Sequence, residues 1–369
     1  MAFTVKLNIL LFFSFVQLAI DGQNNLINHV SDISPQISLF SKNYSPNVSC
    51  YRIPSMITAV NGDLIVAVDE RVTSCGDLKW NDDINIVIRR SRDNGNTWSG
   101  IEKIIDFPLG QSASDPSMIV DKTTGQIFLF YNFMDLNIKR NVYFHHVITS
   151  KDNGLTWSRP KDITAQITLP NWSNDFKFIT SGRGIQTTKG TLLHSIVNIE
   201  KGTYLFGSDD HGQSWYLLNT AINPGDESKI VQLSDGNLMV NSRVNNLGHR
   251  YVHKSVDNGK TWSSNSDSSL IDPSCNASII NHTITSHGIR ENVLIFANAN
   301  SKTTRENMTI KLSFDDGVTW TEGKTIYEGK SAYSSLCILK NGNIGLFFEK
   351  NDYQECTFVS FSFDWLSQK

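Results

Sequence analysis

The sequence predicts an all-β protein, arranged as a six-bladed β-propeller whose blades are four-stranded antiparallel sheets. Three observations lead to this fold: an octapeptide that recurs five times, short apolar runs around it, and a length of 369 residues that accommodates about six such units. A chain that repeats one supersecondary unit at regular intervals builds either a ring of sheets or a linear stack. A linear solenoid is therefore the structural alternative.

The repeated octapeptide reads Ser-x-Asp-x-Gly-x-Thr/Ser-Trp and begins at residues 91, 150, 208, 255 and 313. The start-to-start spacings are 59, 58, 47 and 58 residues, a mean of about 55. Its Asp-Asn-Gly core and close variants tolerate positive φ, as hairpin turns require, and the Asp carboxylate can accept backbone N–H groups across the turn. Five of the eight tryptophans close these octapeptides, and we expect each ring to pack between neighbouring sheets.

Apolar runs with strand character precede or follow the octapeptides, and no segment shows a sustained helical period. These runs are Ile84–Ile88, Ile127–Tyr131, Leu238–Val240, Val293–Phe296 and Ile344–Phe348. The mature chain holds about six units, so the two chain ends must close the sixth. There Ser362–Trp365 resembles a decayed octapeptide. We therefore expect one domain over residues 23–369.

Residues 1–22 have the form of a secretory signal. Lys6 is followed by a twelve-residue apolar stretch from Ile9 to Ile20, which is too short to span a bilayer, and cleavage is expected near Gly22. A buried N-terminal strand or helix is the alternative. From the sequence we expect no later transmembrane helix and no lipid anchor at the C-terminus. The expected location is secreted, or lumenal or on the cell surface.

Composition excludes several classes of function. The formal net charge is −3, which gives no basic footprint for nucleic acid. Gly317–Thr325 ends in Gly-Lys-Thr but has five intervening residues where a P-loop needs four. His145 and His146 lack metal-ligand spacing, and there is no Gly-x-Ser-x-Gly elbow. We expect no cofactor and no metal.

The chain has five cysteines, so in an oxidising compartment at least one stays unpaired. They are Cys50, Cys75, Cys275, Cys337 and Cys356. Cys337 and Cys356 flank a probable strand–turn–strand segment, which makes them one possible pair, but the sequence leaves the connectivity open.

Five charged residues interrupt or end strand-like runs: Arg52, Arg71, Arg243, Arg305 and Glu349. One such arginine alone is as well explained by a solvated strand end or an ion pair. Strand ends in a propeller converge at one face of the central axis, so several arginines together would form one cationic pocket. Arginine clusters bind carboxylates in bidentate fashion.

These segments resemble the exo-sialidase family along nearly the whole mature chain. Tyr51–Pro54 resembles its Arg-Ile-Pro motif, and the five octapeptides resemble its Asp boxes. Further segments that resemble the family, in family order, are Ser114–Ser117, Glu227–Val231, Ser331–Ser334 and Phe347–Lys350. The resemblance implies a six-bladed propeller that cleaves terminal sialic acid from glycoconjugates with retention at the anomeric carbon.

The resemblance also implies residue roles. Arg52, Arg243 and Arg305 match the arginine triad that binds the sialic acid carboxylate, and Glu349 matches the carboxylate that orients the first arginine. Three guanidinium groups leave a positive pocket suited to an anionic sugar.

For catalysis, the resemblance implies Tyr333 as nucleophile, Glu227 as the carboxylate that activates it, and Asp77 as acid/base. A carboxylate nucleophile would be repelled by the charge of the substrate, whereas a neutral tyrosine avoids this repulsion. Each acid has neighbours that fit the residue type equally well; these are Asp82 and Asp83 for Asp77, and Asp226 for Glu227.

Arg71 and Asp115 match residues that contact the sugar around O4 and the N-acyl arm. The N-acyl pocket itself has no clear match, and Trp80 and Trp172 are candidates for it. Two alternatives to hydrolysis stay open. A trans-sialidase would use the same residues and pass the sugar to another glycan, whereas a non-catalytic sialic acid lectin would need only the arginines.

Overall fold

The computed structural model describes residues 32–286 and 289–368, which form 25 strands and two short α-helices. The helices are α1 (Thr164–Ile167) and α2 (Phe363–Ser367). Single 3-10 turns lie at Lys42–Tyr44, Leu78–Trp80 and Pro170–Trp172. The all-β prediction is confirmed. No helix in the described ranges is long and apolar enough to cross a membrane. The expected signal, residues 1–22, lies outside the described residues.

The strands form five hydrogen-bonded sheets in the described ranges. One four-stranded sheet holds β2 (Cys50–Thr58), β3 (Leu64–Arg71), β4 (Ile84–Ser91) and β5 (Glu102–Ile105). The next holds β11 (Gly182–Arg183), β6 (Gln111–Val120), β7 (Ile127–Asp135), β8 (Phe144–Ser150) and β9 (Lys161–Asp162). A third holds β10 (Lys177–Ile179), β13 (Leu192–Asn198), β14 (Gly202–Ser208) and β15 (Tyr216–Ile222), with β12 (Ile185–Gln186) beside β13.

The fourth sheet holds β16 (Ser228–Gln232), β17 (Leu238–Ser242), β18 (His249–Ser255) and β19 (Ser263–Ile271). The fifth holds β20 (Ser278–Ser286), β21 (Ile289–Ala299), β22 (Glu306–Ser313), β23 (Lys324–Ile338), β24 (Ile344–Lys350), β25 (Glu355–Phe361) and β1 (Ile37–Ser41). Each of the five apolar runs with strand character named above lies within a strand.

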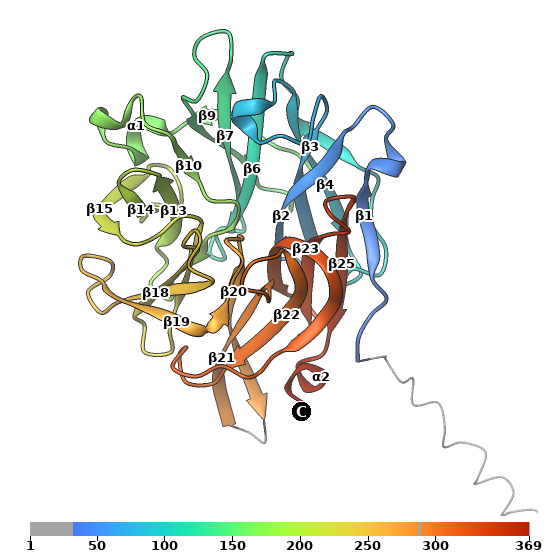
Figure 1. Ribbon diagram of the computed structural model, residues 1–369, viewed down its shortest axis with the longest axis vertical. Coiled ribbons are helices and arrows are strands. Elements are labelled where there is room, and N and C mark those ends of the chain that lie inside the picture. The colour runs from blue at the N-terminus through green and yellow to red at the C-terminus, as the bar shows by residue number, and fades with distance from the viewer. Residues whose placement is uncertain (1–31, 287–288, 369) are drawn as a thin grey trace, which may run out of the picture.

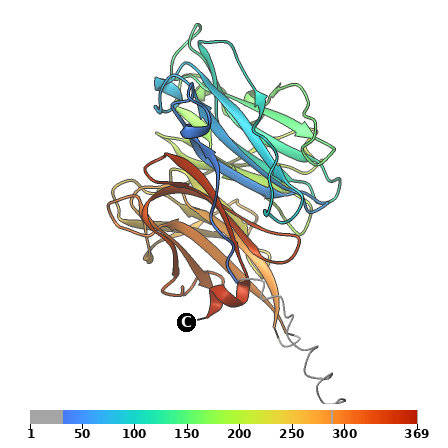
Figure 2. The same cartoon turned by 90° about the vertical axis from the view of Figure 1, so that its right-hand side faces the viewer.

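The sheets follow one another around the molecule in chain order (Figure 1), and Figure 2 shows them from the side. The first strand closes the ring, because β1 pairs antiparallel with the last strand, β25. A linear solenoid is thereby excluded, and the sheets form a propeller. Six separate four-stranded blades are not seen: β23 joins seven strands, pairing with β22 through Lys324–Lys330 and with β24 through Ser331–Ile338.

Apolar clusters fill the spaces between neighbouring sheets, and the tryptophans of the octapeptides contribute to them. The Trp98 ring meets the Phe358 ring of the adjacent sheet at 5.2 Å between centroids, and Trp215 meets Phe128 and Phe130 at 5.5 and 5.1 Å. Trp157, Trp262 and Trp320 pack against equivalent clusters. The predicted packing of these rings between sheets is confirmed.

Each octapeptide forms the same closed turn. In the first, Ser91 Oγ accepts the Gly95 N–H at 2.9 Å and donates to Asp93 Oδ1 at 2.8 Å. The two Asp93 oxygens accept the N–H and hydroxyl of Thr97 at 2.8 and 2.6 Å. Asn94 and Gly95 have φ of 58° and 88°, which explains the residue types at these positions. The other four octapeptides repeat this hydrogen bonding.

The expected decayed octapeptide at the C-terminus is wrong. Ser362 instead caps the N-terminus of α2, its Oγ accepting the Trp365 N–H at 3.1 Å. Without the Asp-x-Gly core this segment lacks the positive-φ residues of the turn and continues as a helix.

The possible pairing of Cys337 with Cys356 is also wrong. Both are buried free thiols, and the disulfide joins Cys50 to Cys75 across 5.7 Å between Cα atoms. Cys337 lies in β23 opposite Gly345, whereas Cys356 lies in β25 opposite Glu349. With β24 between them and a four-residue offset along it, the two thiols are much farther apart than a disulfide spans.

Candidate active site

A cavity of about 200 Å³ lies where the inner strands converge, and its lining contains Arg71, Asp77, Asp115, Glu227 and Tyr333 together with Arg243. Arg305 and Glu349 line a small adjoining cavity of about 10 Å³. Arg52 reaches both groups, since it contacts Asp77 at 3.5 Å and Glu349 at 3.1 Å. The structure thus brings together all nine residues singled out in the sequence.

Three inner strands change register at this cavity. The shifts lie between Arg52 and Ser55 in β2, between Ser114 and Ser117 in β6, and between Ser331 and Ser334 in β23. Bulges re-aim side chains and recur beside active sites. In β2 and β6 they contain left-handed residues, Ile53 at φ 63° and Asp115 at φ 61°. For isoleucine this backbone is an outlier that its surroundings must impose.

Glu349 fixes the geometry of the β2 bulge. Its Oε1 accepts Arg52 Nε at 3.1 Å and the Ile53 N–H at 2.9 Å, and its Oε2 accepts the Tyr333 N–H at 3.1 Å. This carboxylate is buried, so its hydrogen bonds and the guanidinium charge compensate its lost hydration. One side chain therefore positions both Arg52 and Tyr333.

Glu227 lies against the hydroxyl of Tyr333. Tyr333 Oη donates to Glu227 Oε2 at 2.7 Å, and the same oxygen accepts Arg243 Nη1 at 2.6 Å. Burial, reinforced by the Glu227 charge, raises the pKa of Tyr333 well above its ordinary value, so the phenol is neutral. The neighbouring acid, Asp226, also lines the cavity, but its hydrogen bonds are to other groups. Its Oδ1 accepts the Glu227 N–H and its Oδ2 accepts Asn245 Nδ2.

Arg305 differs from the other two arginines because, among the described residues, no carboxylate lies within ion-pair distance of it. Its Nη1 donates to Tyr353 Oη at 3.2 Å and its Nη2 to the Ser274 carbonyl at 2.9 Å. Its guanidinium carbon lies 5.5 Å from the centroid of the Tyr333 ring. Tyr353 was missed in the sequence because it lies three residues beyond the family-like segment Phe347–Lys350 and belongs to no motif itself.

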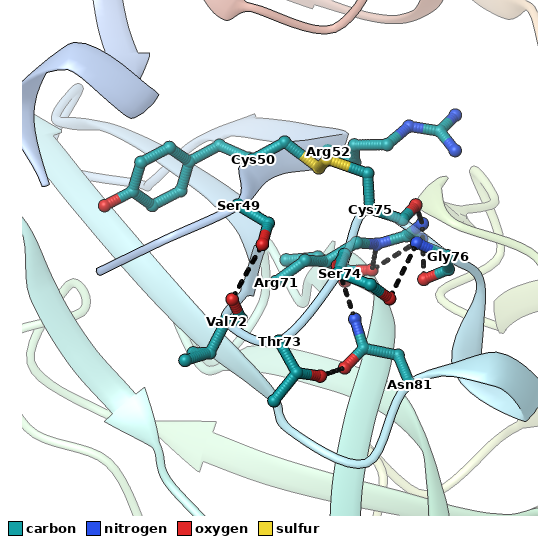
Figure 3. The surroundings of a disulfide bond; sticks show 12 residues. Ser49, Cys50, Arg52, Arg71, Val72, Thr73, Ser74, Cys75, Gly76 and Asn81 are labelled. Carbon is teal, nitrogen blue, oxygen red and sulfur yellow. Dashed lines mark hydrogen bonds and ion pairs between the residues drawn. A yellow bond between two sulfur atoms is a disulfide. The ribbon is translucent and has the colours of Figure 1, made fainter. Parts of the chain in front are cut away.

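Asp77 follows Cys75 by two residues, in a loop that the Cys50–Cys75 disulfide attaches to β2. Figure 3 shows this disulfide and the loop residues from Val72 to Gly76. Arg71 braces this loop, donating to the carbonyls of Cys75 and Gly76 and to Asp77 Oδ1 at 2.9, 3.1 and 2.9 Å. The Asp77 side chain is still 70% exposed. Desolvation would raise the pKa of Asp77, but Arg71 and Arg52 lower it on balance. Asp82 and Asp83, the alternative candidates for the acid/base residue, do not line the cavity.

Asp115 lies beside a second buried carboxylate, Asp69. Asp69 Oδ1 accepts the Asp115 N–H at 3.0 Å, while Asp69 Oδ2 accepts Arg71 Nε at 3.1 Å and Ser114 Oγ at 2.5 Å. Burial and then the Asp69 charge raise the pKa of Asp115 well above its ordinary value. Asp115 therefore lines the cavity with a carboxyl group whose charged form is disfavoured, and its Oδ2 accepts Asn132 Nδ2 at 3.1 Å.

An apolar wall completes the cavity, formed by Leu78, Tyr143, Phe176, Phe178 and Ile199. Sequence reasoning missed it, although Phe176, just before β10, and Phe178, within β10, are two residues apart, the spacing that puts side chains on one face of an extended segment. The candidate Trp172 is wrong, because its ring is 0% exposed and packs on Tyr204 in the core. Trp80 is 68% exposed and is not part of the cavity lining.

In the ranges that the structure describes, no group of three or more His, Cys, Asp or Glu side chains is arranged to hold a metal ion. A closed ring of antiparallel sheets with arginines, carboxylates and a tyrosine at its centre defines this protein as a propeller with a polar central site. Residues 74–346 match the BNR repeat-like domain family, and the chain belongs to that family.

Two curated relatives and one solved structure illustrate the similarity. A sialidase of Micromonospora viridifaciens is 36% identical over 347 residues, covering 86% of this chain and 52% of that protein. A sialidase of Bacteroides fragilis strain YCH46 is 30% identical over 369 residues, covering 90% and 66%. The structure of the Hadza microbial sialidase Hz136 superposes with a TM-score of 0.82 at 29% identity, covering 90% and 69%. The chain thus spans about half to two thirds of the length of these curated relatives.

Proposed function

We propose that the chain is an exo-α-sialidase, which hydrolyses terminal sialic acids of glycoproteins, glycolipids and oligosaccharides. One observation carries the proposal: the neutral Tyr333 hydroxyl lies 2.7 Å from Glu227 in a cavity lined by arginines. The relatives named above are sialidases, and they support a glycoside hydrolase. Because the chain spans only part of their length, its substrate and mechanism are argued from its own residues.

The substrate carboxylate would bind between Arg52, Arg243 and Arg305. Glu349 and Glu227 each occupy one edge of a guanidinium and leave other N–H groups free for a ligand. The ring centroid of Tyr333 lies 5.4 and 5.5 Å from the guanidinium carbons of Arg52 and Arg305. A carboxylate bound there places the adjacent anomeric carbon near the tyrosine hydroxyl.

In this mechanism Tyr333 Oη attacks the anomeric carbon and gives its proton to Glu227, while the bond to the leaving oxygen breaks. Asp77 protonates the leaving oxygen. Water then attacks the anomeric carbon and the bond from that carbon to Tyr333 Oη breaks; Asp77 takes the water proton, and Glu227 returns a proton to the departing phenolate. Two inversions give net retention.

Arg71 and Asp115 would contact the sugar around O4 and the N-acyl arm. The apolar wall of Tyr143, Phe176 and Phe178 suits the methyl end of an N-acyl group, since burying it removes apolar surface from water.

The assay is release of free sialic acid from a fluorogenic sialoside, repeated with lactose as acceptor. Hydrolysis without transfer supports the sialidase, and a sialylated lactose product supports a trans-sialidase instead. Binding without turnover supports a lectin. A 3-fluorinated sialosyl fluoride should leave one sialosyl unit on the protein, and peptide mapping should place it on Tyr333. Label on a carboxylate would remove Tyr333 from the nucleophile role.

We further propose that the ring consists of six blades, with β23 contributing one half to each of two blades. In support, the apolar cluster that lies between β20–β23 and β23–β25 resembles those between separate sheets. An experimental structure in which these strands form one flat sheet would contradict this. We also propose that residues 1–22 direct export; Met1 at the N-terminus of the native protein would contradict it.

A further inference from the structure

Tyr353, which is not among the predicted site residues, contacts both Arg52 and Arg305. Its ring centroid lies 4.1 Å from the guanidinium carbon of Arg52. Its hydroxyl accepts Arg305 Nη1 at 3.2 Å. The face of the ring thus holds one cation by a cation–π contact while the oxygen at its edge holds the other.

The backbone that presents Tyr353 is strained. Asn351, Asp352 and Tyr353 have φ of 54°, 55° and 65°, three consecutive left-handed residues without a glycine. Asparagine and aspartate tolerate this conformation, but a bulky tyrosine adopts it rarely and only where the surroundings impose it. Such strain gathers at functional sites.

Hydrogen bonds on both sides hold this turn in place. The Asn351 N–H donates to the Lys330 carbonyl at 2.8 Å, Asn351 Oδ1 accepts the Tyr327 hydroxyl at 2.5 Å, and Asn351 Nδ2 donates to Glu355 Oε1 at 2.7 Å. The turn therefore connects directly to β23, the strand that carries Tyr333. These hydrogen bonds fix the position of the Tyr353 backbone relative to β23, so its side chain can orient the two arginines.

The chemistry of the contact explains why a phenol serves here. Arg52 and Arg243 are each held by a glutamate, at 3.1 and 2.6 Å, whereas Arg305 is held by neutral oxygens. A third carboxylate in place of Tyr353 would neutralise Arg305 and compete with an anionic ligand. A phenol orients the guanidinium and leaves its charge available.

We propose that Tyr353 is a positioning residue, which aligns Arg52 and Arg305 as a clamp for the carboxylate of an acidic sugar. The proposal rests on the proposed function and deepens it. Its test uses Tyr353→Phe, which keeps the stacked ring and removes only the hydroxyl, and Tyr353→Leu, which removes both contacts. Tyr216→Phe is the matched control, since it removes a hydroxyl that donates to Asp209 on an exposed turn.

The measurement is calorimetric affinity for 2-deoxy-2,3-didehydro-sialic acid and for its uncharged methyl ester. We expect Tyr353→Phe to bind the acid about tenfold more weakly, as for one lost hydrogen bond to a charged group. Tyr353→Leu should lose more, and both variants should bind the ester within about twofold of wild type. KM for an aryl sialoside should rise with kcat nearly unchanged, because the carboxylate is bound alike before and during reaction.

Each result has one meaning. Equal losses for acid and ester, or no loss for the acid, overturn the positioning role while the proposed function stands. Wild-type protein that binds neither ligand overturns the proposed function itself. If Tyr353→Leu fails to fold, the comparison of Tyr353→Phe with Tyr216→Phe still decides.

Discussion

The octapeptide turns and the central cavity both depend on carboxylates, but their hydrogen bonds span very different distances along the chain. In a turn, the Asp93 carboxylate binds a hydroxyl four residues away, and the arrangement recurs five times. In the cavity, Glu349 binds an arginine 297 residues away, and Glu227 binds a tyrosine 106 residues away. The turns are local and redundant, whereas the site is assembled once, by closure of the ring.

This difference predicts whether a single substitution should change mainly the stability of the fold or mainly the chemistry of the site. Loss of one turn leaves four others and removes no group from the cavity, so it should change stability and spare chemistry. Loss of one cavity residue has no substitute in the chain, so it should change chemistry more than stability. Four substitutions, two of them with a pH dependence, test this division, from the largest expected effect to the smallest.

The largest effect is expected for Tyr333→Phe. Removing the hydroxyl removes the proposed nucleophile while the ring still packs with Ile53 and Ala332. Turnover of an aryl sialoside should fall by about 10³-fold or more, with a melting temperature close to wild type. Undiminished turnover would show that the chemistry does not depend on this residue.

Asp77→Ala should separate substrates by their leaving group. A proton donor contributes about 10²–10⁴-fold when the leaving group is a sugar alkoxide, and little when it is a stable aryl anion. Sialyllactose hydrolysis should therefore collapse while an activated aryl sialoside is still cleaved. Equal losses on both substrates would exclude Asp77 as the acid.

The pH dependence of wild-type protein sharpens the same assignment. In the free protein the arginines lower the pKa of Asp77, so its protonated form is scarce. A bound substrate carboxylate would take part of the Arg52 charge and raise that pKa. The basic limb of kcat, which reports the complex, should thus lie at higher pH than the basic limb of kcat/KM, which reports free protein.

Arg305→Ala should act on binding. Because no carboxylate of the described residues pairs with Arg305, its removal leaves no buried acid uncompensated, and the loss reports the ligand contact itself. We expect about 2–4 kcal/mol weaker binding of a carboxylate-bearing transition-state mimic. Arg250, whose guanidinium is buried against Asp272 at 3.2 Å, is the contrasting case: its loss should destabilise the fold. Wild-type affinity in Arg305→Ala would remove this arginine from the site.

The same division explains what the sequence could predict. The octapeptide turns could be predicted directly, because the Asp-x-Gly residues that form each turn lie within eight residues of sequence. Their regular repetition then predicted the strands and the ring. Arg52 and Glu349 carry no local sign of their contact, so their association came only from the resemblance to a family. Tyr353 and the wall of Phe176 and Phe178 have neither a local pattern nor a matching motif. They became visible only once β24, β25 and β10 were placed.

The smallest effect is expected for Asp315→Ala in the fifth octapeptide. Asp315 accepts the Thr319 N–H and hydroxyl at 2.9 and 2.6 Å and the Ser313 hydroxyl at 2.8 Å. Because these bonds lie at an exposed turn, we expect a loss of about 1 kcal/mol in the free energy of unfolding, measured by urea denaturation. kcat should not change. Glu322→Ala, which removes an exposed carboxylate two residues beyond the octapeptide, is the control and should be neutral.

The pH dependence of this loss follows from the carboxylate. Burial alone would raise the pKa of Asp315, but the hydrogen bonds from Thr319 and Ser313 lower it to about 2, from 3.8. A depressed pKa stabilises the fold above the pKa of the unfolded chain, and that stabilisation disappears as pH falls through the folded value. The difference between wild type and Asp315→Ala should thus be full at pH 6, shrink below pH 4 and disappear only below pH 2. A difference that stays constant over this range, or one accompanied by lost turnover, would break the division between local turns and the assembled site.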